Sequence, residues 1–384
     1  MQLEPSLVAT LRSRLDTMTD QLSRLVSCES PSDDLGLLGR CANEVSDLGT
    51  ELLGVQPSAV EVDGRTHLVW RLGGPPAVVL VGHYDTVWAA GTIDRWPFRI
   101  DSAGRATGPG VFDMKAGIIQ MFHALAVLPS RALTSDRAGV AVVLTADEEL
   151  GSQTSRALIE ETARGARAAL VLEPSAQGAL KVARKGTSMY EVHALGRSSH
   201  AGLEPEKGIN ATVELAHQVL AVAGLGRPEI GTTVTPTVAS AGTTTNTVPA
   251  AAVLHVDVRA TDPAEQERVD GEIRRLTPVV EGSSLRIEGG INRPPLDAAA
   301  SSSLMTLAVS VAGRLGLDPI TGVSVGGASD GNFTAGVGVP TLDGLGADGD
   351  GAHAEGEYTI VTAMPERAAL VAGMVAEILA ANGA

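Results

Sequence analysis

The sequence predicts an α/β protein with a mostly parallel sheet, into which a smaller α+β domain is inserted. Three short, continuous apolar runs, AVVLVGH (77–83), VAVVLTA (140–146) and AALVLEP (168–174), alternate with helical patterns. Such runs are typical of strands that are buried on both faces of a parallel sheet. In the middle of the chain the strands instead alternate between polar and apolar residues, which is typical of a sheet with one exposed face.

The first α/β segment is expected to alternate helices and strands along the chain. We expect helices over 1–22, 35–54, 113–128 and 152–164, and strands over 67–72, 77–83, 140–146 and 168–174. The pattern resumes near the C-terminus with a helix over 302–315, a strand over 339–344 and a helix over 365–381.

The middle segment has a different order of elements. It has alternating strands over 187–196, 233–240, 253–260 and 284–289, with helices over 209–224 and 263–280. The order strand, helix, strand, strand, helix, strand is that of a split βαβ, ferredoxin-like domain. We therefore expect an inserted domain over 178–288 between two parts, 1–177 and 289–384, of one α/β domain.

Composition limits the partners that this chain can have. With 29 basic and 45 acidic residues its net charge is −16, which argues against nucleic acid or an anionic membrane as partner. Two cysteines, Cys28 and Cys41, are too few for a disulfide framework and favour a cytoplasmic protein. No stretch approaches 18 uncharged apolar residues, and the N-terminus lacks the apolar core of a signal peptide.

Polar side chains follow the ends of the predicted parallel strands. In an open α/β sheet the ligand site lies beyond the carboxyl ends of the strands, so these side chains are expected to converge. Two further members lie in the Gly-rich loops GPGVFDMKAG and DGDGAHAEGE. The set comprises His83, Asp85, Asp113, Glu148, Glu149, Glu173 and His353.

So many carboxylates in one cleft repel one another unless cations lie between them. Two divalent ions that share one bridging carboxylate account for the set. We assign Asp113 as the bridge, His83 and Glu173 to one ion, and Glu149 and His353 to the other. Imidazole and carboxylate ligands without a thiolate favour Zn²⁺, with Co²⁺ or Mn²⁺ as alternatives.

Two carboxylates of the set remain. Glu148 adjoins a predicted ligand and is interpreted as the general base for a water that the ions activate. Asp85 lies two residues after His83 and is interpreted as the carboxylate that fixes the tautomer of this histidine.

Taken in order, HYDTVW, GPGVFDMKAG, TADEELGS, LEPS, SSHAG and GAHAEGE resemble the motifs of the M20 family of di-zinc metallopeptidases, and within it those of the glutamate carboxypeptidases. The resemblance covers nearly the whole chain. It implies the same metal and base residues, an inserted lid domain that usually also dimerises, and hydrolysis of an amide beside a free carboxylate. The family often has a second Asp after the bridging one, across a cis peptide bond. Met114 stands there, which leaves the geometry of this bond open.

The resemblance also implies residues that contact the substrate. His200, in SSHAG, corresponds to a histidine that reaches the active site of the partner subunit and helps to hold the oxyanion. Asn246 corresponds to a position that contacts the substrate carboxylate. Arg293, which precedes a proline, can offer a bidentate fork to the same carboxylate.

One lysine bears on the choice of amino acid. Lys181 corresponds to the lysine that meets the side-chain carboxylate of glutamate in the glutamate carboxypeptidases. Arg184 and Lys185 lie nearby in the sequence and compete with Lys181 for this role.

Two other motifs suggest different chemistry. GVSVG (322–326) fits a nucleophile elbow, with Ser324, Asp343 and His353 in the order of a serine hydrolase. GLGADG (344–349) fits a dinucleotide-binding turn. GVSVG lacks both the strand before it and the helix after it that its motif requires, and a serine hydrolase would leave Asp113, Glu148, Glu149 and Glu173 without a role. GLGADG follows a strand but is not followed by a segment that can form the required helix. We interpret both as coincidences in a chain with 44 glycines.

We therefore expect a metal-dependent exopeptidase that removes a C-terminal amino acid, in the first place glutamate, from a peptidyl or N-acyl group. N-acyl-amino-acid deacylases of the acetylornithine or succinyl-diaminopimelate type are alternatives that would use the same metal site. A serine hydrolase and a non-catalytic binding protein are the rivals from other classes, and the intact Glu148 argues against the latter. We expect a homodimer that pairs through the inserted domain.

Overall fold

The computed structural model describes residues 6–133, 135–136 and 138–381. The chain forms two compact units. Unit 1 comprises Met1–Ala183, Leu296–Val325 and Ser329–Ala384, and unit 2 comprises Arg184–Pro295 and Gly326–Ala328. The boundaries of unit 2 therefore fall a few residues after the expected limits 178 and 288.

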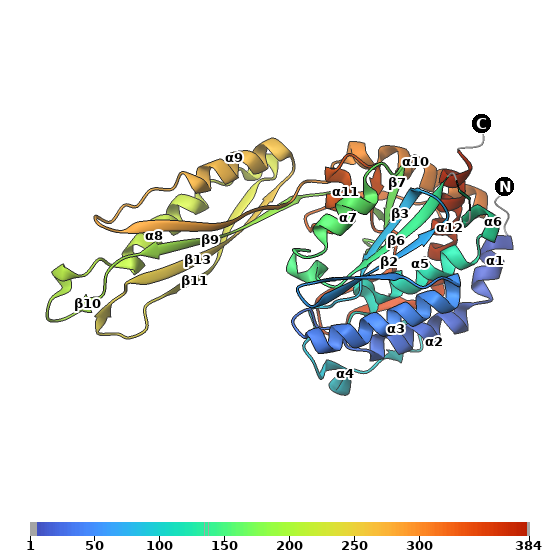
Figure 1. Cartoon of the computed structure of the whole chain (residues 1–384), viewed down its shortest axis with the longest axis horizontal. Helices are drawn as coiled ribbons and strands as arrows, with labels where there is room; N and C mark the ends of the chain where they lie inside the picture. Colours follow the sequence, from blue (N-terminus) through green and yellow to red (C-terminus); the bar gives the residue numbers. More distant parts are fainter. Residues whose placement is uncertain (1–5, 134, 137, 382–384) are drawn as a thin grey trace. The chain divides into compact units, whose positions relative to one another are not determined.

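Unit 1 is built on a six-stranded sheet with the strand order β1-β2-β6-β3-β7-β16 (Figure 1). The four strands from β6 to β16 are parallel, and β1 and β2 add an antiparallel edge. This confirms the predicted α/β class with a mostly parallel sheet. The strands are β1 Ser58–Val62, β2 Arg65–Leu72, β3 Pro76–His83, β6 Gly139–Thr145, β7 Ala168–Val171 and β16 Thr341–Leu342.

Helices cover both faces of this sheet, which explains why its central strands are continuously apolar. One core cluster joins the sheet to α1 Ser6–Arg12, α2 Leu15–Ser27, α3 Leu35–Leu53, α5 Ala116–Ala126, α10 Ala298–Leu315 and α12 Met364–Ala380. A second, on the other face, joins it to α7 Arg156–Ala163 and α11 Gly331–Gly336. The short helices α4 Thr92–Arg95 and α6 Ser130–Leu133 complete the unit.

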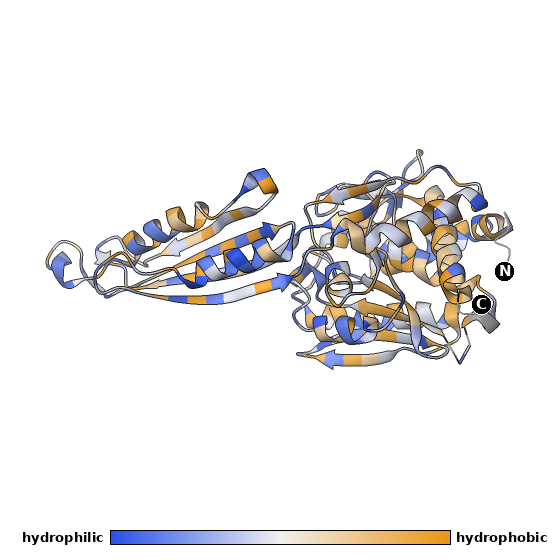
Figure 2. Cartoon of the chain, turned by 90° about the horizontal axis from the view of Figure 1, so that it is seen from above, coloured by the Kyte–Doolittle hydropathy of each residue, from blue (hydrophilic) through white to orange (hydrophobic). Residues whose placement is uncertain are grey.

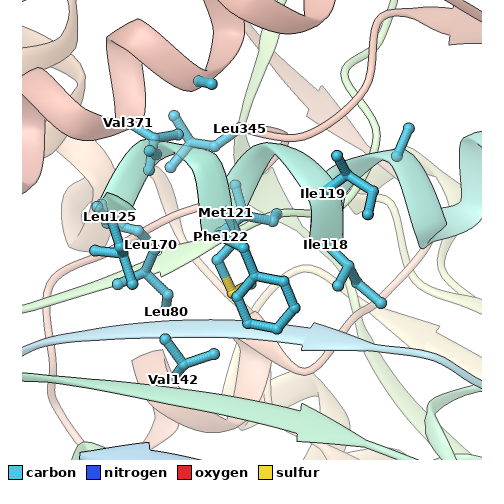
Figure 3. Close-up of a cluster of buried hydrophobic side chains, with 14 of the residues drawn as sticks. Leu80, Ile118, Ile119, Met121, Phe122, Leu125, Val142, Leu170, Leu345 and Val371 are labelled. Atoms are coloured by element: carbon cyan, nitrogen blue, oxygen red, sulfur yellow. The ribbon is translucent and has the colours of Figure 1, made fainter. Parts of the chain in front are cut away.

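The helix α5 lies at the centre of the larger core cluster. Figure 3 shows Phe122 pointing from α5 toward Leu80 and Val142 of the sheet, and all three side chains are fully buried. The ring of Phe122 also meets Trp70 of β2 edge to face, with 5.2 Å between the ring centroids. This packing holds α5, the helix that follows the Asp113 loop, against the sheet.

Within the part of the chain that the structure describes, one helix, α10, is long and apolar enough to cross a membrane if only length and composition are considered. Core helices of globular proteins meet the same criterion. In this structure Leu304, Val311 and Leu315 of α10 are buried in the larger core cluster.

Short strands add two small sheets to unit 1 that the sequence pattern did not predict. One has the order β17-β18-β5-β4, and the other pairs β15 with β8. These strands are β4 Arg99–Ile100, β5 Arg105–Thr107, β8 Leu180–Arg184, β15 Gly322–Val325, β17 Gly349–Asp350 and β18 Tyr358–Ile360. The loop between β17 and β18 carries His353, so the first sheet anchors that loop at both ends.

Unit 2 is a four-stranded antiparallel sheet with the order β11-β13-β9-β14 and two helices on one face. Along the strands apolar and polar residues alternate (Figure 2), because one face packs on the helices and the other is open. The elements are β9 Gly186–Leu195, α8 Ala211–Ala223, β11 Thr233–Ala241, β13 Ala251–Ala260, α9 Pro263–Arg274 and β14 Ser284–Arg293, with a small pair of β10 Ser199–His200 and β12 Thr247–Val248.

The start of α5 illustrates how tightly unit 1 packs beneath the predicted site. A Cβ added at Gly117 would lie 2.2 Å from the main-chain oxygen of Leu172, the residue before Glu173. We expect Gly117→Ala to lower the free energy of unfolding by about 1–3 kcal/mol, because helix and strand must move apart. Thermal unfolding of the variant and the wild type would measure this change in the free energy of unfolding. Gly39→Ala in α3, where a Cβ would meet nothing within 4 Å, is the control, and an equal loss in both variants would contradict this account.

Candidate active site

Three parallel strands deliver the predicted residues to one edge of the unit 1 sheet. β3 ends at His83, and β6 ends at Thr145 shortly before the turn that carries Glu148 and Glu149. β7 ends at Val171, two residues before Glu173. Because the strands run in parallel, their carboxyl ends meet, as the sequence predicted.

Asp113 lies between two imidazoles. Its Oδ1 is 3.3 Å from Nε2 of His83, and its Oδ2 is 3.4 Å from Nε2 of His353. Each imidazole has a second carboxylate: His83 Nε2 lies 3.3 Å from Glu173, and His353 Nε2 lies 3.1 Å from Glu149. The five predicted metal ligands are thus brought together as two groups that share one carboxylate.

The donor set fits a pair of divalent ions. In a tetrahedral zinc site with bonds of about 2.0–2.1 Å, neighbouring ligand atoms are about 3.3 Å apart, close to the separations within both groups. Oδ1 of Asp113 is buried, and among the described residues no donor makes a well-formed hydrogen bond to it, although Nε2 of His83 lies 3.3 Å away. A buried carboxylate oxygen in this position is costly unless positive charge lies beside it. Ligand atoms of Glu148 also lie within 4.8 Å of His83 and Glu173.

The pKa values of the two imidazoles measure how strongly these carboxylates attract positive charge. Burial alone would lower the pKa of His83, but the carboxylates around it outweigh burial and raise the pKa well above its ordinary value. Asp113 and then Glu149 raise the pKa of His353 to about 10. Burial would raise the pKa of Asp113, yet the two histidines hold it well below its usual range.

Asp85 connects the ends of β3 and β6. Its carboxylate accepts hydrogen bonds from the main-chain N–H groups of Glu148 and Glu149, at 3.2 Å each, and from the hydroxyl of Ser32 at 2.8 Å. Nδ1 of His83 is nearer to the main-chain oxygen of Asp85, at 3.0 Å, than to its carboxylate, at 3.4 Å. The main chain of Asp85 therefore supports the His83 tautomer more directly than its side chain, which instead fixes the Glu148 turn.

Two supports of this site, Ser32 and Glu357, were not predicted from the sequence. Glu357 is fully buried and accepts hydrogen bonds from the main-chain N–H of Phe112 and from the indole of Trp88, both at 3.1 Å. Burial raises the pKa of Glu357 to about 7. Its position in GAHAEGE beside His353 was a signal, but an acidic residue in a Gly-rich loop does not by itself indicate burial. The Asp113–Met114 peptide bond is cis.

Comparison with known proteins places this chain in a family. Residues 79–377 match the sequence profile of peptidase family M20/M25/M40. The chain belongs to this family. It is therefore a hydrolase of a family whose members are metal-dependent peptidases and amidohydrolases, and the His, Asp and Glu cluster is where a metal can bind.

Its relatives within the M20 family differ in what they act on. Carboxypeptidase G2 of Pseudomonas sp. is 29% identical over 374 residues, which cover 93% of this chain and 88% of the relative. Succinyl-diaminopimelate desuccinylase of Methylobacterium radiotolerans is 27% identical over 286 residues, covering 70% and 73%. The M20 metallo-carboxypeptidase Sso-CP2 of Sulfolobus solfataricus has the same fold, with a TM-score of 0.75, 16% identity, and coverage of 94% and 99%.

The predicted substrate residues of this M20 hydrolase are distributed over both units. Lys181 lies in unit 1, on β8. His200, Asn246 and Arg293 lie in unit 2. His200 and Asn246 are neighbours there, because the main chain of the residue after His200 donates to Asn246 at 2.8 Å. Arg293 lies at the end of β14, opposite Thr187 at the start of β9.

Ser324 does not form a nucleophile elbow. It lies inside the two-stranded sheet of β15 and β8, where its side chain is exposed, and no helix follows β15 directly. His353, the predicted base of this rival mechanism, faces Asp113 and Glu149 instead. The structure therefore contradicts the serine-hydrolase alternative.

We expect Asp85→Asn to weaken both metal binding and activity by about 10–100-fold, because an amide cannot accept hydrogen bonds at both positions that face the Glu148 turn. Zinc content after dialysis against a graded series of chelator, together with turnover, would measure this. Ser32→Ala should weaken metal binding and activity less than Asp85→Asn does, since it removes only one of the donors to Asp85. Asp33→Asn, at an exposed neighbour, is the control. Unchanged zinc retention in Asp85→Asn would show that this carboxylate does not support the site.

Proposed function

We propose that the protein is a di-metal exopeptidase that releases a C-terminal amino acid, in the first place glutamate, from a peptidyl or N-acyl group. The observation that carries this proposal is the sharing of Asp113 between the pairs His83–Glu173 and His353–Glu149. Two carboxylate–imidazole pairs joined by one carboxylate provide the ligands of a two-ion centre for hydrolysis.

In this proposal Glu148 moves the proton. Two ions bound by the ligands above would polarise the scissile carbonyl and lower the pKa of a water molecule. Glu148, which lies beside a ligand but is not needed as one, accepts the proton of the attacking water and passes it to the leaving amine. The bonds from the main chain of the Glu148 turn to Asp85 hold this base in place while it changes its charge.

Glutamate is proposed as the released amino acid because of the relative carboxypeptidase G2 and because of Lys181. Both competitors of Lys181 bind main-chain oxygens: Arg184 donates to Gly327 at 3.0 Å, and Lys185 donates to Gly231 at 2.5 Å. These contacts give Arg184 and Lys185 structural roles. Lys181 is proposed as the cation for the side-chain carboxylate because it corresponds to the lysine that has this role in the glutamate carboxypeptidases. The relatives named as succinyl-diaminopimelate desuccinylases support an N-acyl-amino-acid deacylase as the second candidate.

The distribution of the proposed substrate residues supports a dimer. Arg293 is paired near the start of β9, and His200 lies beyond its end, so about 25 Å of strand separates them within unit 2. One small substrate cannot touch both residues of the same chain. We infer that His200 of one chain completes the site of another. We further propose that the enzyme acts in the cytoplasm, which its two free cysteines support.

The role of the base is tested by Glu148→Gln. We expect turnover to fall by about 10²–10⁴-fold while zinc content stays unchanged, because the amide keeps the shape of the side chain but cannot take a proton. Turnover and metal content should be measured on the same sample. Glu160→Gln on α7, outside the site, is the control. Loss of zinc together with activity would mean that Glu148 is a ligand and not the base.

The dimer is tested by mixing two inactive variants, Glu148→Gln and His200→Ala. In a mixed dimer one of the two sites has an intact base from one chain and an intact histidine from the other. Random exchange makes half of the dimers mixed, so we expect about a quarter of the wild-type activity to return. No recovery, in a sample shown by labelled chains to have exchanged subunits, would contradict a histidine supplied by the second chain.

Substrate choice is tested with peptides and N-acyl amino acids that differ only in the C-terminal residue. We expect glutamate to be released at least ten-fold faster, by kcat/KM, than its amide glutamine, because Lys181 gains a charged partner. Lys181→Met should reduce this ratio and leave the cleavage of C-terminal alanine unchanged. Faster cleavage of N-succinyl or N-acetyl diamino acids than of any glutamate substrate would favour the deacylase instead.

A further inference from the structure

The open face of the unit 2 sheet carries a second cluster of imidazoles and carboxylates. The strand register places Glu191 of β9 directly opposite His255 of β13 on one side and Glu288 of β14 on the other. His193 is two residues after Glu191 on β9, so its side chain lies on the same face. Three adjacent strands therefore bring two glutamates and two histidines to one place.

The ligand atoms of this cluster lie almost as close together as those of the active site. Nε2 of His193 is 3.1 Å from Oε2 of Glu191 and 3.5 Å from Oε2 of Glu288. Nδ1 of His255 is 3.7 Å from the other oxygen of Glu191. The atoms of Glu191, His193 and Glu288 all fall within 4.8 Å of one another. Neighbouring ligands of a tetrahedral zinc ion are about 3.3 Å apart, which these separations approach.

The cluster has more negative charge from its glutamates than its neighbours offset. Glu191 and Glu288 are directly opposed across β9 and β14, and like charges at such positions repel. Arg286 pairs with Oε1 of Glu288, so Oε2 faces His193. Arg259 forms its salt bridge with Asp257 on its own strand. Among the described residues, one guanidinium, that of Arg286, forms a salt bridge with one of these two glutamates and so compensates part of their charge.

We propose that this cluster is a binding site for a divalent transition metal ion of the Zn²⁺ class, held by Glu191, His193 and Glu288, with His255 or water as the fourth ligand. Imidazole and carboxylate donors on a half-exposed surface suit Zn²⁺ and its neighbours, and do not suit Mg²⁺ or Ca²⁺, which prefer oxygen ligands. All four residues belong to unit 2, so this site is distinct from the candidate active site and does not depend on the proposed function. Its ion would link three strands of the sheet.

The test is the number of Zn²⁺ ions bound per full-length chain, measured by mass spectrometry of the metal after equilibrium dialysis at a buffered micromolar free Zn²⁺ concentration. We expect three ions in the wild type and two in His193→Ala. Glu288→Gln, which keeps its size on an exposed strand, should also lose one ion and guards against a folding defect in the histidine variant. His217→Ala removes an exposed histidine of α8 outside the cluster and should keep all three.

A further variant separates this inference from the proposed function. Asp113→Ala should lose the ions of unit 1 and keep the ion of unit 2. The double variant Asp113→Ala with His193→Ala should lose the ion of unit 2 as well. An equal zinc count in the wild type, His193→Ala and Glu288→Gln would overturn the proposal. Loss of the same ion in His217→Ala would also overturn it, because the binding would then not depend on this cluster.

Discussion

The attraction between Asp113 and the positive charges on both sides of it is the interaction on which the site depends. Five carboxylates and two histidines lie at one edge of the sheet, and several of them are almost fully buried. Such an arrangement is stable only if positive charge lies among the carboxylates. The raised pKa values of His83 and His353 show that the protein can place protons there. A divalent ion brings twice the charge of one imidazolium, and its binding should release these protons.

The scaffold beneath the site must be rigid, because repelling groups would otherwise move apart. Close packing on both faces of the parallel sheet provides this rigidity, with Phe122 over Leu80 and Val142 on one side. Asp85 extends this rigidity to the site, because its carboxylate links the end of β3 to the turn after β6 by accepting hydrogen bonds from main-chain N–H groups of that turn. Glu357 likewise fixes the Asp113 loop, because its carboxylate accepts a hydrogen bond from the main-chain N–H of Phe112. Buried carboxylates outside the ligand set thus hold the ligands in place.

Long, regular patterns in the sequence predicted the fold well, and short or irregular segments did not. Continuous apolar runs located the three parallel strands and hence the residues that follow them. Strands of two or three residues, such as β17 and β18, carry no measurable periodicity, so the small sheet that anchors the His353 loop could not be predicted. Residues 1–5 of the expected first helix lie outside the described residues, and the rest is divided into α1 and α2.

The limits of unit 2 show why glycine is an ambiguous signal. The strand expected over 284–289 ends at the first residue of the pair Gly289–Gly290, yet β14 continues through both residues to Arg293. Gly289 has a φ of 82°, and a Cβ there would lie 2.1 Å from the main-chain oxygen of Met189. The glycine therefore permits close approach to β9 within the sheet and does not end the strand. A sequence pattern alone cannot distinguish these two uses.

The two faces of unit 2 are subject to different constraints. The face under α8 and α9 is fixed by packing, and residues such as Val192 and Val256 have little freedom to change. The open face has no such requirement, and folding alone would favour opposite charges or neutral residues across its strands. Glu191 opposite Glu288 is unfavourable on that basis. Arg286 pairs with Glu288, and the two histidines add to this compensation only when they carry positive charge. A pair of repelling glutamates flanked by imidazoles is therefore better explained by a bound cation than by the needs of the sheet.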